Sequence, residues 1–266
     1  MSEQSNVGEE TLTDYFLWQA ERAVPFIAYQ KFTRHQENAV TGADWEWWIV
    51  GRKGGMKIRV QAKRVRSESR KNYAGIAYNR QEQIKKLIES SESDNAYPVY
   101  AFYTPHLNGC ELSQHSGKLT GVHIASAHDV YRGFFVNGNV NADKSALIAL
   151  SCPIECVFCT NHNPREAISM FLDYEADRSE QVSPSIAGFH SEIPIHIEEF
   201  IAMRKRGVSI EGSIALRRSF ASRFDEMYKD KANSLFVLDV RNDDSLKEGR
   251  LLRELPSWMA GALHDL

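Results

Sequence analysis

Three side chains with complementary chemistry lie on two short segments of the N-terminal half. Asp44 belongs to residues 41–50, and Gln61 and Lys63 belong to residues 57–64. A carboxylate and an amide oxygen are hard ligands that suit a divalent cation, and a lysine can orient water or balance the charge of a phosphate. If the two segments pair, this set is sufficient for metal-dependent cleavage of a phosphodiester bond.

The two segments have the composition of a β-hairpin. Polar and apolar side chains alternate strictly along residues 57–64, which predicts one buried face and one wet or functional face. Residues 41–50 are rich in aromatic and β-branched side chains, as strands are. Gly54-Gly55 supplies the glycines of a tight turn between them.

The turn fixes which side chains face one another. With Gly54-Gly55 at its centre, we expect Glu46 opposite Lys63 and Trp48 opposite Gln61. Asp44 then lies diagonally from Lys63. A slip by two residues would keep these polar groups on one face, whereas a slip by one would separate them.

The same pattern is also typical of an exposed strand face with a Glu–Lys cross-strand pair. Two features of Asp44 favour a site instead. It stands where a strand begins, directly after Thr-Gly-Ala, and three tryptophans follow within the same segment, Trp45, Trp47 and Trp48. A carboxylate in apolar surroundings requires a cation, either Lys63 or a metal ion.

At these residues the chain resembles the PD-(D/E)xK nuclease superfamily, in particular its Mrr-like restriction endonuclease branch. That branch has Gly-x-Asp at the start of one strand and Gln-x-Lys, often followed by Arg, on the next. Here the matching residues are Gly42-Ala43-Asp44 and Gln61-Ala62-Lys63-Arg64. Upstream, Glu37 matches the acidic residue that these folds often supply from the first helix or its end. The resemblance covers roughly residues 10–105.

The resemblance implies an α/β fold with a restriction-endonuclease-like core, in which helices flank a central mixed sheet. We assign this core to residues 1–150. The sequence itself predicts a helix from Thr11, an amphipathic helix over residues 81–88 and a buried strand over residues 96–103. A strand, helix and strand in this order favour parallel pairing.

The C-terminal half, residues 151–266, is expected to be an α/β extension. It either continues the same sheet or forms a small accessory subdomain. A helix begun by Pro164, a helix over residues 197–206 and a buried strand over residues 234–240 are predicted there.

The resemblance also implies the ligands of a Mg²⁺ or Mn²⁺ ion. Asp44 would be the central ligand, and the side chain of Gln61 and the backbone carbonyl of Ala62 would complete the protein's share. Lys63 would orient or help to deprotonate the attacking water. The catalytic set is therefore Asp44, Gln61 and Lys63 with Glu37.

One departure from the commoner Glu-x-Lys form concerns charge. Gln61 is neutral, so the site has one negative charge fewer and should hold Mg²⁺ more weakly unless Glu37 or Glu46 compensates. Both glutamates are candidates for outer-shell contacts or for a second metal.

Substrate contacts are expected from the basic stretch that follows the site. It begins with Arg64 and Arg66 and suits the phosphate backbone of a nucleic acid. The resemblance implies DNA in preference to RNA. A solvated loop and helix face would have the same composition. Because the net charge of the 266-residue chain is −3, any nucleic-acid groove must be local.

Three of the four cysteines are clustered. Cys152, Cys156 and Cys159 have the spacing of the radical S-adenosylmethionine motif. One alternative is zinc held by three of Cys152, Cys156, Cys159 and His162, with or without Cys110. Another is an iron–sulfur cluster, which some nucleases of this superfamily carry with a different placement of the cysteines. We favour buried thiols, since cysteine behaves as a small hydrophobe and too few residues follow for a radical-enzyme barrel.

The composition of the chain argues against a membrane protein and a secreted protein. No stretch approaches the roughly twenty apolar residues that span a bilayer, and residues 1–10 lack a secretory core. We therefore expect a cytoplasmic protein without membrane contact. The resemblance implies a nuclease with a role in restriction or anti-phage defence, and with a homodimer or a defence-system protein as partner. The alternative is a catalytically silent nucleic-acid-binding or regulatory protein with a degenerate site.

Overall fold

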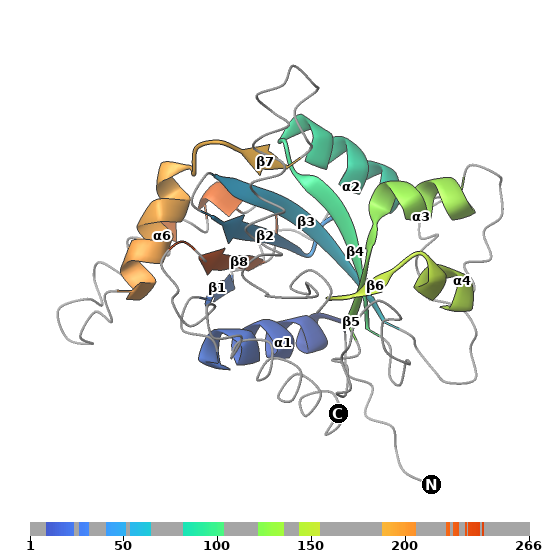
Figure 1. Ribbon diagram of the computed structural model, residues 1–266, viewed down its shortest axis with the longest axis horizontal. Helices are drawn as coiled ribbons and strands as arrows, with labels where there is room; N and C mark the ends of the chain where they lie inside the picture. The colour runs from blue at the N-terminus through green and yellow to red at the C-terminus, as the bar shows by residue number, and fades with distance from the viewer. Residues whose placement is uncertain are drawn as a thin grey trace, which may run out of the picture.

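The computed structural model describes part of the chain. The described residues are 9–23, 27–31, 41–51, 54–64, 82–103, 122–135, 144–154, 188–205, 222–223, 226–228, 232, 234–239 and 241. Within them the fold is α/β, with helices on both faces of a mixed sheet (Figure 1).

The described helices and strands follow one another in an irregular α/β order. The helices are α1 (Glu9–Ala23), α2 (Glu82–Ser93), α3 (Ala127–Phe134), α4 (Lys144–Ala149) and α6 (Ile195–Lys205). The strands are β1 (Ile27–Lys31), β2 (Trp45–Val50), β3 (Gly55–Arg64), β4 (Tyr97–Tyr103), β5 (Val122–Ser126), β6 (Cys152–Pro153), β7 (Phe189–His190) and β8 (Ser234–Asp239). The strand order in the sheet is β1-β8-β2-β3-β4-β5-β6, and β7 pairs with β3 at the side of this path.

The hairpin β2–β3 is confirmed, but its expected register is wrong. Val50 pairs with Gly55, so Glu46 lies opposite Arg59 and Trp48 lies opposite Lys57. The shift is by an even number of residues, which keeps the polar side chains on the expected common face.

Gly54 and Gly55 do not form the centre of the turn. Both instead lie in close contact with residues far along the chain. A Cβ on Gly54, whose φ is +148°, would lie 2.3 Å from the carbonyl oxygen of His190 on β7. A Cβ on Gly55 would lie 2.5 Å from Cδ1 of Ile193. Residues far along the chain therefore determine the register, and a local turn rule could not include them.

The expected crossover unit is confirmed. β3 and β4 pair in parallel, with Gln61 beside Tyr100 and Lys63 beside Phe102, and α2 connects them. Parallel neighbours require such a crossover because the chain must return to the same end of the sheet.

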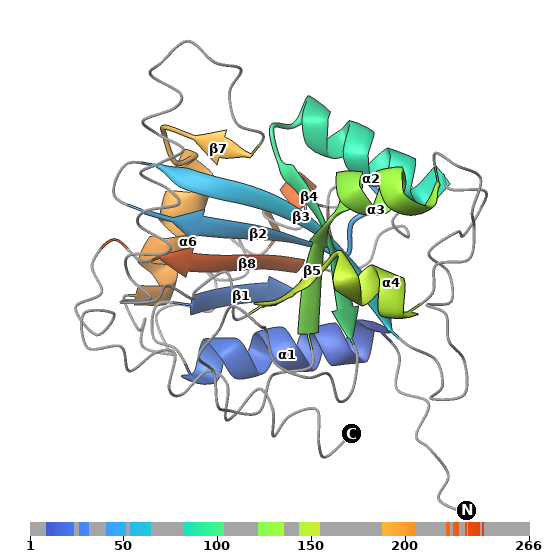
Figure 2. The ribbon, with the colours of Figure 1, turned by 45° about the vertical axis from the view of Figure 1, so that its right-hand side comes forward.

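Helices cover the two faces of the sheet unequally. α1 packs on one face, against apolar side chains of β1, β2, β3, β4 and β8. On the opposite face α2, α3 and α4 cover the β4–β5 side, and α6 covers the β1–β8–β2 side. Figure 2 shows α1 beneath the sheet and α2 and α3 above it. On this second face, the polar side chains of β3 lie between the apolar cluster beneath α2, α3 and α4 and the apolar cluster beneath α6.

The strand predicted over residues 234–240 is confirmed as β8, and it is an internal strand. It pairs antiparallel with β1 and parallel with β2. The helix predicted over residues 197–206 corresponds to α6, whereas the helix expected from Pro164 lies outside the described residues. In the described part of the chain, no helix combines the length and apolarity that a bilayer span needs.

Candidate metal centre

Four polar side chains of β3 point to the face that α2 partly covers. Lys57, Arg59, Gln61 and Lys63 alternate with apolar residues, and each is buried. Buried ionic and amide groups must have partners, because removal from water without compensation is costly. The partners divide this row into two clusters, one at each end of β3.

The first cluster is built on Asp44, directly before β2. Its backbone N–H donates to the carbonyl of Val60 at 2.8 Å, which extends the hairpin by one bond. Its carboxylate Oδ2 accepts from the backbone N–H of Ala62 at 2.6 Å and from Nε2 of Gln61 at 2.5 Å. The carboxylate of Asp44 thus takes the place of a strand partner at the end of β3.

The side-chain NH₂ group of Gln61 also contacts a second oxygen. Nε2 of Gln61 lies 3.2 Å from the carbonyl oxygen of Ala62. One NH₂ group therefore donates to the carboxylate of Asp44 and the carbonyl of Ala62, two of the three oxygens expected to bind a cation. We refer to Asp44, Gln61, Ala62 and Lys63 as the candidate centre.

The neighbouring strand supplies an aromatic wall. Tyr100 and Phe102 lie beside Gln61 and Lys63, and their rings stack with centroids 5.7 Å apart. Burial raises the pKa of Tyr100 above its ordinary value, and the negative charge of Asp44 raises it further. The phenol is therefore a neutral donor at physiological pH. Its oxygen is buried and has no hydrogen-bond partner among the described residues.

Gln83 at the start of α2 is a site residue that the sequence did not reveal. Its Nε2 donates to Oε1 of Gln61 at 2.9 Å. Its own Oε1 is buried without a hydrogen-bond partner in the described structure. The available signal was a polar residue in the first turn of a helix that must cross β3.

Gly42 allows the backbone of α2 to pack closely against the segment that precedes β2. Its φ is +70°, and a Cβ there would lie 2.7 Å from the carbonyl oxygen of Gln83 and 3.0 Å from the backbone nitrogen of Leu87. Glycine is the residue that tolerates both this conformation and this approach. The glycine of Gly-x-Asp thus allows the first turns of α2 to pack beside Asp44.

The second cluster contains Glu46, which does not form the expected cross-strand pair with Lys63. Oε2 of Glu46 lies 3.5 Å from Nζ of Lys57 and 3.7 Å from Nε of Arg59. Its Oε1 accepts from Nε1 of Trp48 at 2.9 Å and from the hydroxyl of Tyr228 at 3.1 Å. These contacts follow from the observed register, which places Glu46 beside Arg59.

Asp94 lies just after α2 and belongs to the same cluster. We refer to Glu46, Lys57, Arg59 and Asp94 as the Glu46 cluster. Asp94 forms ion pairs with Lys57, at 2.7 Å, and with Arg59. Arg59 also donates to the carbonyl of Ser90 at 2.6 Å. The cluster therefore fastens the C-terminal end of α2 to β3, while Gln83 contacts β3 at the other end.

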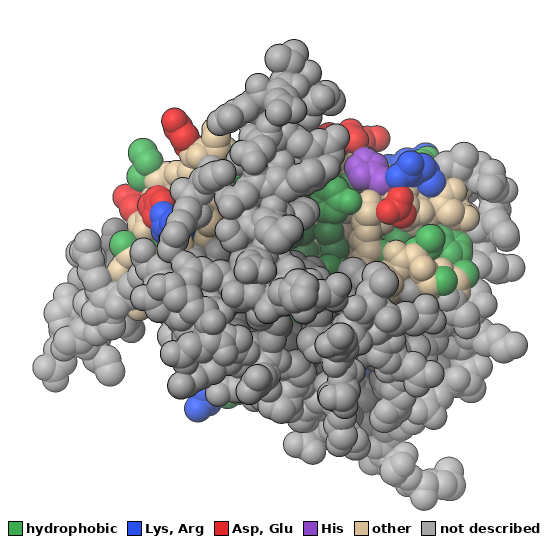
Figure 3. Space-filling view, in the orientation of Figure 1, with side chains coloured by type: hydrophobic (Ala, Val, Ile, Leu, Met, Phe, Trp, Pro, Cys, Tyr) green, Lys and Arg blue, Asp and Glu red, His purple; other side chains and the backbone are tan. Residues whose placement is uncertain are grey.

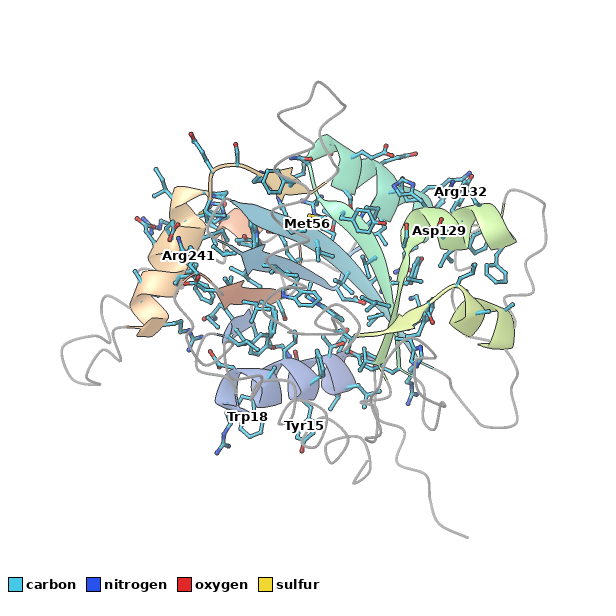
Figure 4. The ribbon with its side chains drawn as sticks, in the orientation of Figure 1. Tyr15, Trp18, Met56, Asp129, Arg132 and Arg241 are labelled. Atoms are coloured by element: carbon cyan, nitrogen blue, oxygen red, sulfur yellow. The ribbon has the colours of Figure 1, made fainter. Side chains whose placement is uncertain are left out.

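Charged groups on the surface of α3 and α6 have neighbours of opposite sign. Arg132 pairs with Asp129 at 2.7 Å, and both point away from the sheet (Figure 4). Arg241 pairs with Glu198, which with Asp239 raises the pKa of its guanidinium. Red and blue groups are interspersed at both ends of the visible face (Figure 3). These paired charges are poorly suited to attracting a phosphate backbone.

Of the other residues predicted from the sequence, the structure describes some and not others. Arg64 ends β3 and is partly exposed, and Cys152 lies in the short strand β6. Glu37, Arg66, Cys156 and Cys159 lie outside the described residues. Within the described ranges, no group of three or more His, Cys, Asp or Glu side chains could hold a metal ion. Among the described residues, a cation at the candidate centre would have one carboxylate together with amide and backbone oxygens.

Comparisons with known proteins give a family and no activity. No curated protein and no solved structure matches the chain. The model of the family described as "Family of unknown function (DUF6615)" matches residues 1–242, which is most of the chain. The protein therefore belongs to the DUF6615 family.

Proposed function

We propose that this protein is a metal-dependent nuclease that hydrolyses phosphodiester bonds, in DNA in preference to RNA. The observation that supports the proposal is the convergence of Asp44, Gln61 and Ala62 at one end of β2–β3, with Lys63 on the same face of β3. The mixed sheet with a β3–α2–β4 crossover is consistent with a restriction-endonuclease-like core. That finer fold assignment is part of the proposal.

The donor set fits a small hard cation. The NH₂ group of Gln61 stands between a carboxylate and a carbonyl oxygen, so this position already holds a partial positive charge. Asp44, the carbonyl of Ala62 and Oε1 of Gln61 would hold Mg²⁺ or Mn²⁺. Such an ion, when bound, supplies neutralisation of phosphate charge and activation of water.

The protein's own groups have separate tasks. Lys63, buried beside Phe102, can donate to the attacking water or to a phosphate oxygen and offset negative charge there. The stacked rings of Tyr100 and Phe102 exclude bulk water from one side of the centre, which strengthens its electrostatic interactions. Arg64, at the end of β3, and Arg66 are the proposed contacts to the nucleic-acid backbone.

The biological role is proposed from the resemblance alone, since a fold does not determine a function. We infer a cytoplasmic enzyme of restriction or anti-phage defence that acts as a homodimer or with a defence-system protein.

A second candidate function is a catalytically silent nucleic-acid-binding or regulatory protein. The neutrality of Gln61 favours this candidate, because its amide satisfies Asp44 without any metal. The two functions differ in one measurable respect, which is cleavage that depends on both a metal and Lys63.

The test is a cleavage assay on plasmid, linear and single-stranded DNA and on RNA, with Mg²⁺, Mn²⁺ or EDTA. Asp44→Asn and Lys63→Met keep the size of each side chain and remove its charge. Lys85→Gln, on the exposed face of α2, is the matched control for loss of a lysine. We expect cleavage by the wild type and the control, and a loss of about 10²-fold or more in both site variants.

Cleavage that persists in both site variants would refute the proposed site. Nucleic-acid binding without cleavage under any metal condition would favour the silent protein.

A further inference from the structure

We propose that Gln83 is a positioning residue that controls which atom of Gln61 faces Asp44, and that the two side-chain amides turn together when a divalent cation binds. This inference rests on the proposed function for the existence of the cation. It adds a residue that no motif of the sequence indicated.

The orientation of Gln61 in the structure is the opposite of the one that a cation needs. Its NH₂ group points to Asp44 and Ala62, and its Oε1 points to Gln83. A cation can be bound only by the oxygen. A half turn of the amide exchanges the two atoms without moving the β3 backbone, because oxygen and nitrogen occupy nearly equivalent positions in the side chain.

Gln83 must change its role at the same time. In the observed orientation Nε2 of Gln83 donates to Oε1 of Gln61. After Gln61 has turned, its Nε2 faces Gln83, and only an acceptor can pair with it. Gln83 has such an acceptor, since its buried Oε1 lacks a hydrogen-bond partner in the described part of the chain. A half turn of the second amide supplies it.

The contacts of α2 at both ends oppose a shift of the whole helix, so the rotation of the two side-chain amides is the simpler adjustment. Close approach at Gly42 holds the backbone of Gln83 in place, and the Glu46 cluster fastens the other end of the helix. The adjustment is therefore confined to two side chains that each offer a donor and an acceptor. A residue at position 83 that can only accept should hold Gln61 permanently in the cation-binding orientation.

The Gln83→Glu variant provides that acceptor. We expect it to bind Mn²⁺ at least about fivefold more tightly than the wild type, as measured by isothermal titration calorimetry at pH 8. Lys85→Gln removes one positive charge on the exposed face of α2, which changes the net charge by the same amount, and it measures the general electrostatic effect. Gln83→Met removes both hydrogen-bonding groups and should leave the Mn²⁺ affinity within about twofold of the wild type, because each orientation loses one partner.

A second measurement follows the amides directly. In ¹⁵N-labelled protein, diamagnetic Mg²⁺ should shift the side-chain NH₂ signals of Gln61 and Gln83 at the same cation concentration. The Gln61→Glu and Gln83→Glu variants assign the two signals. Cation binding that leaves the Gln83 signal unchanged, or a Gln83→Glu affinity equal to that of Lys85→Gln, would overturn the inference.

The two proposals can fail separately. If Asp44→Asn binds Mn²⁺ as well as the wild type does, the cation does not lie at the candidate centre and both proposals are wrong. If the cation depends on Asp44 but the two amides respond independently, the proposed metal site stands and the coupling is refuted.

Discussion

At the scale of single residues, the candidate centre has an unusually small charge for a metal site. In the described structure Asp44 is its single carboxylate, and Lys63 lies on the same face of β3. The NH₂ group of Gln61 donates to the carboxylate of Asp44 and offsets part of its negative charge. Metal binding should accordingly be weak and reversible, in contrast to a structural zinc site, where metal supplies the folding energy.

A buried histidine gives the protein a specific sensitivity to acid. His123 on β5 lies beside Phe102, and its Nδ1 is 3.3 Å from Oγ of Ser151. Burial lowers its pKa from 6.5 to about 4. Between these values the unfolded state binds more protons than the folded state, so the free energy of unfolding decreases as the pH falls through this window and is unaffected above it.

We expect the His123→Leu variant to lose this sensitivity. The wild type should lose up to about 3 kcal/mol of stability between pH 6.5 and pH 4 through His123, and the variant should show a shallower decrease. Urea unfolding at several pH values measures the slope for each protein. Burial also lowers the pKa of His190, so part of the slope should remain. Equal slopes would contradict the assignment to His123.

At the scale of elements, α2 links the two polar clusters of β3. Its first turn contacts Gln61 through Gln83, and the region after its last turn pairs with Lys57 and Arg59 through Asp94. Replacing one partner of such a buried ionic cluster is expected to be destabilising, because it leaves another charge uncompensated. The Glu46 cluster thus supports the candidate centre by holding α2 in register with β3.

The Gly42→Ala variant tests the docking of α2. A Cβ there would collide with the backbone of Gln83 and would require a strained φ, so we expect a loss of about 1–3 kcal/mol in the free energy of unfolding. Gly133→Ala in α3 is the matched control, because its Cβ would meet only the end of a flexible side chain, Leu150 Cδ1 at 3.1 Å. The control should be neutral or slightly stabilising in urea unfolding. Equal effects of the two substitutions would show that the close approach at Gly42 does not matter.

The sequence predicted those elements whose signal is local. The alternation in β3, the amphipathic pattern of α2 and the apolar run of β4 are each complete within a few residues, and all three are present. The register of the hairpin was predicted wrongly because β7 and Ile193 constrain Gly54 and Gly55 from far along the chain. Gln83 was missed for the same reason, since its role depends on where α2 crosses β3.

At the scale of the whole molecule, the sheet is assembled from both halves of the chain. β8 lies between β1 and β2, and Tyr228 from the C-terminal half donates to Glu46. The pKa of Tyr228 is raised by burial and by Glu46, so its hydroxyl remains a donor. The hairpin that supports Asp44 is therefore an internal part of one sheet, and residues of the C-terminal half stabilise its neighbouring cluster.

The most direct test of the proposed centre is the position of the cation. Crystals of the protein soaked in Mn²⁺ would locate the ion by its anomalous scattering. We expect one anomalous peak within about 2.0–2.4 Å of a carboxylate oxygen of Asp44 and of the carbonyl oxygen of Ala62, with Oε1 of Gln61 turned toward it. Mn²⁺ bound elsewhere in the molecule, with the NH₂ group of Gln61 still between Asp44 and Ala62, would contradict the assignment of this site.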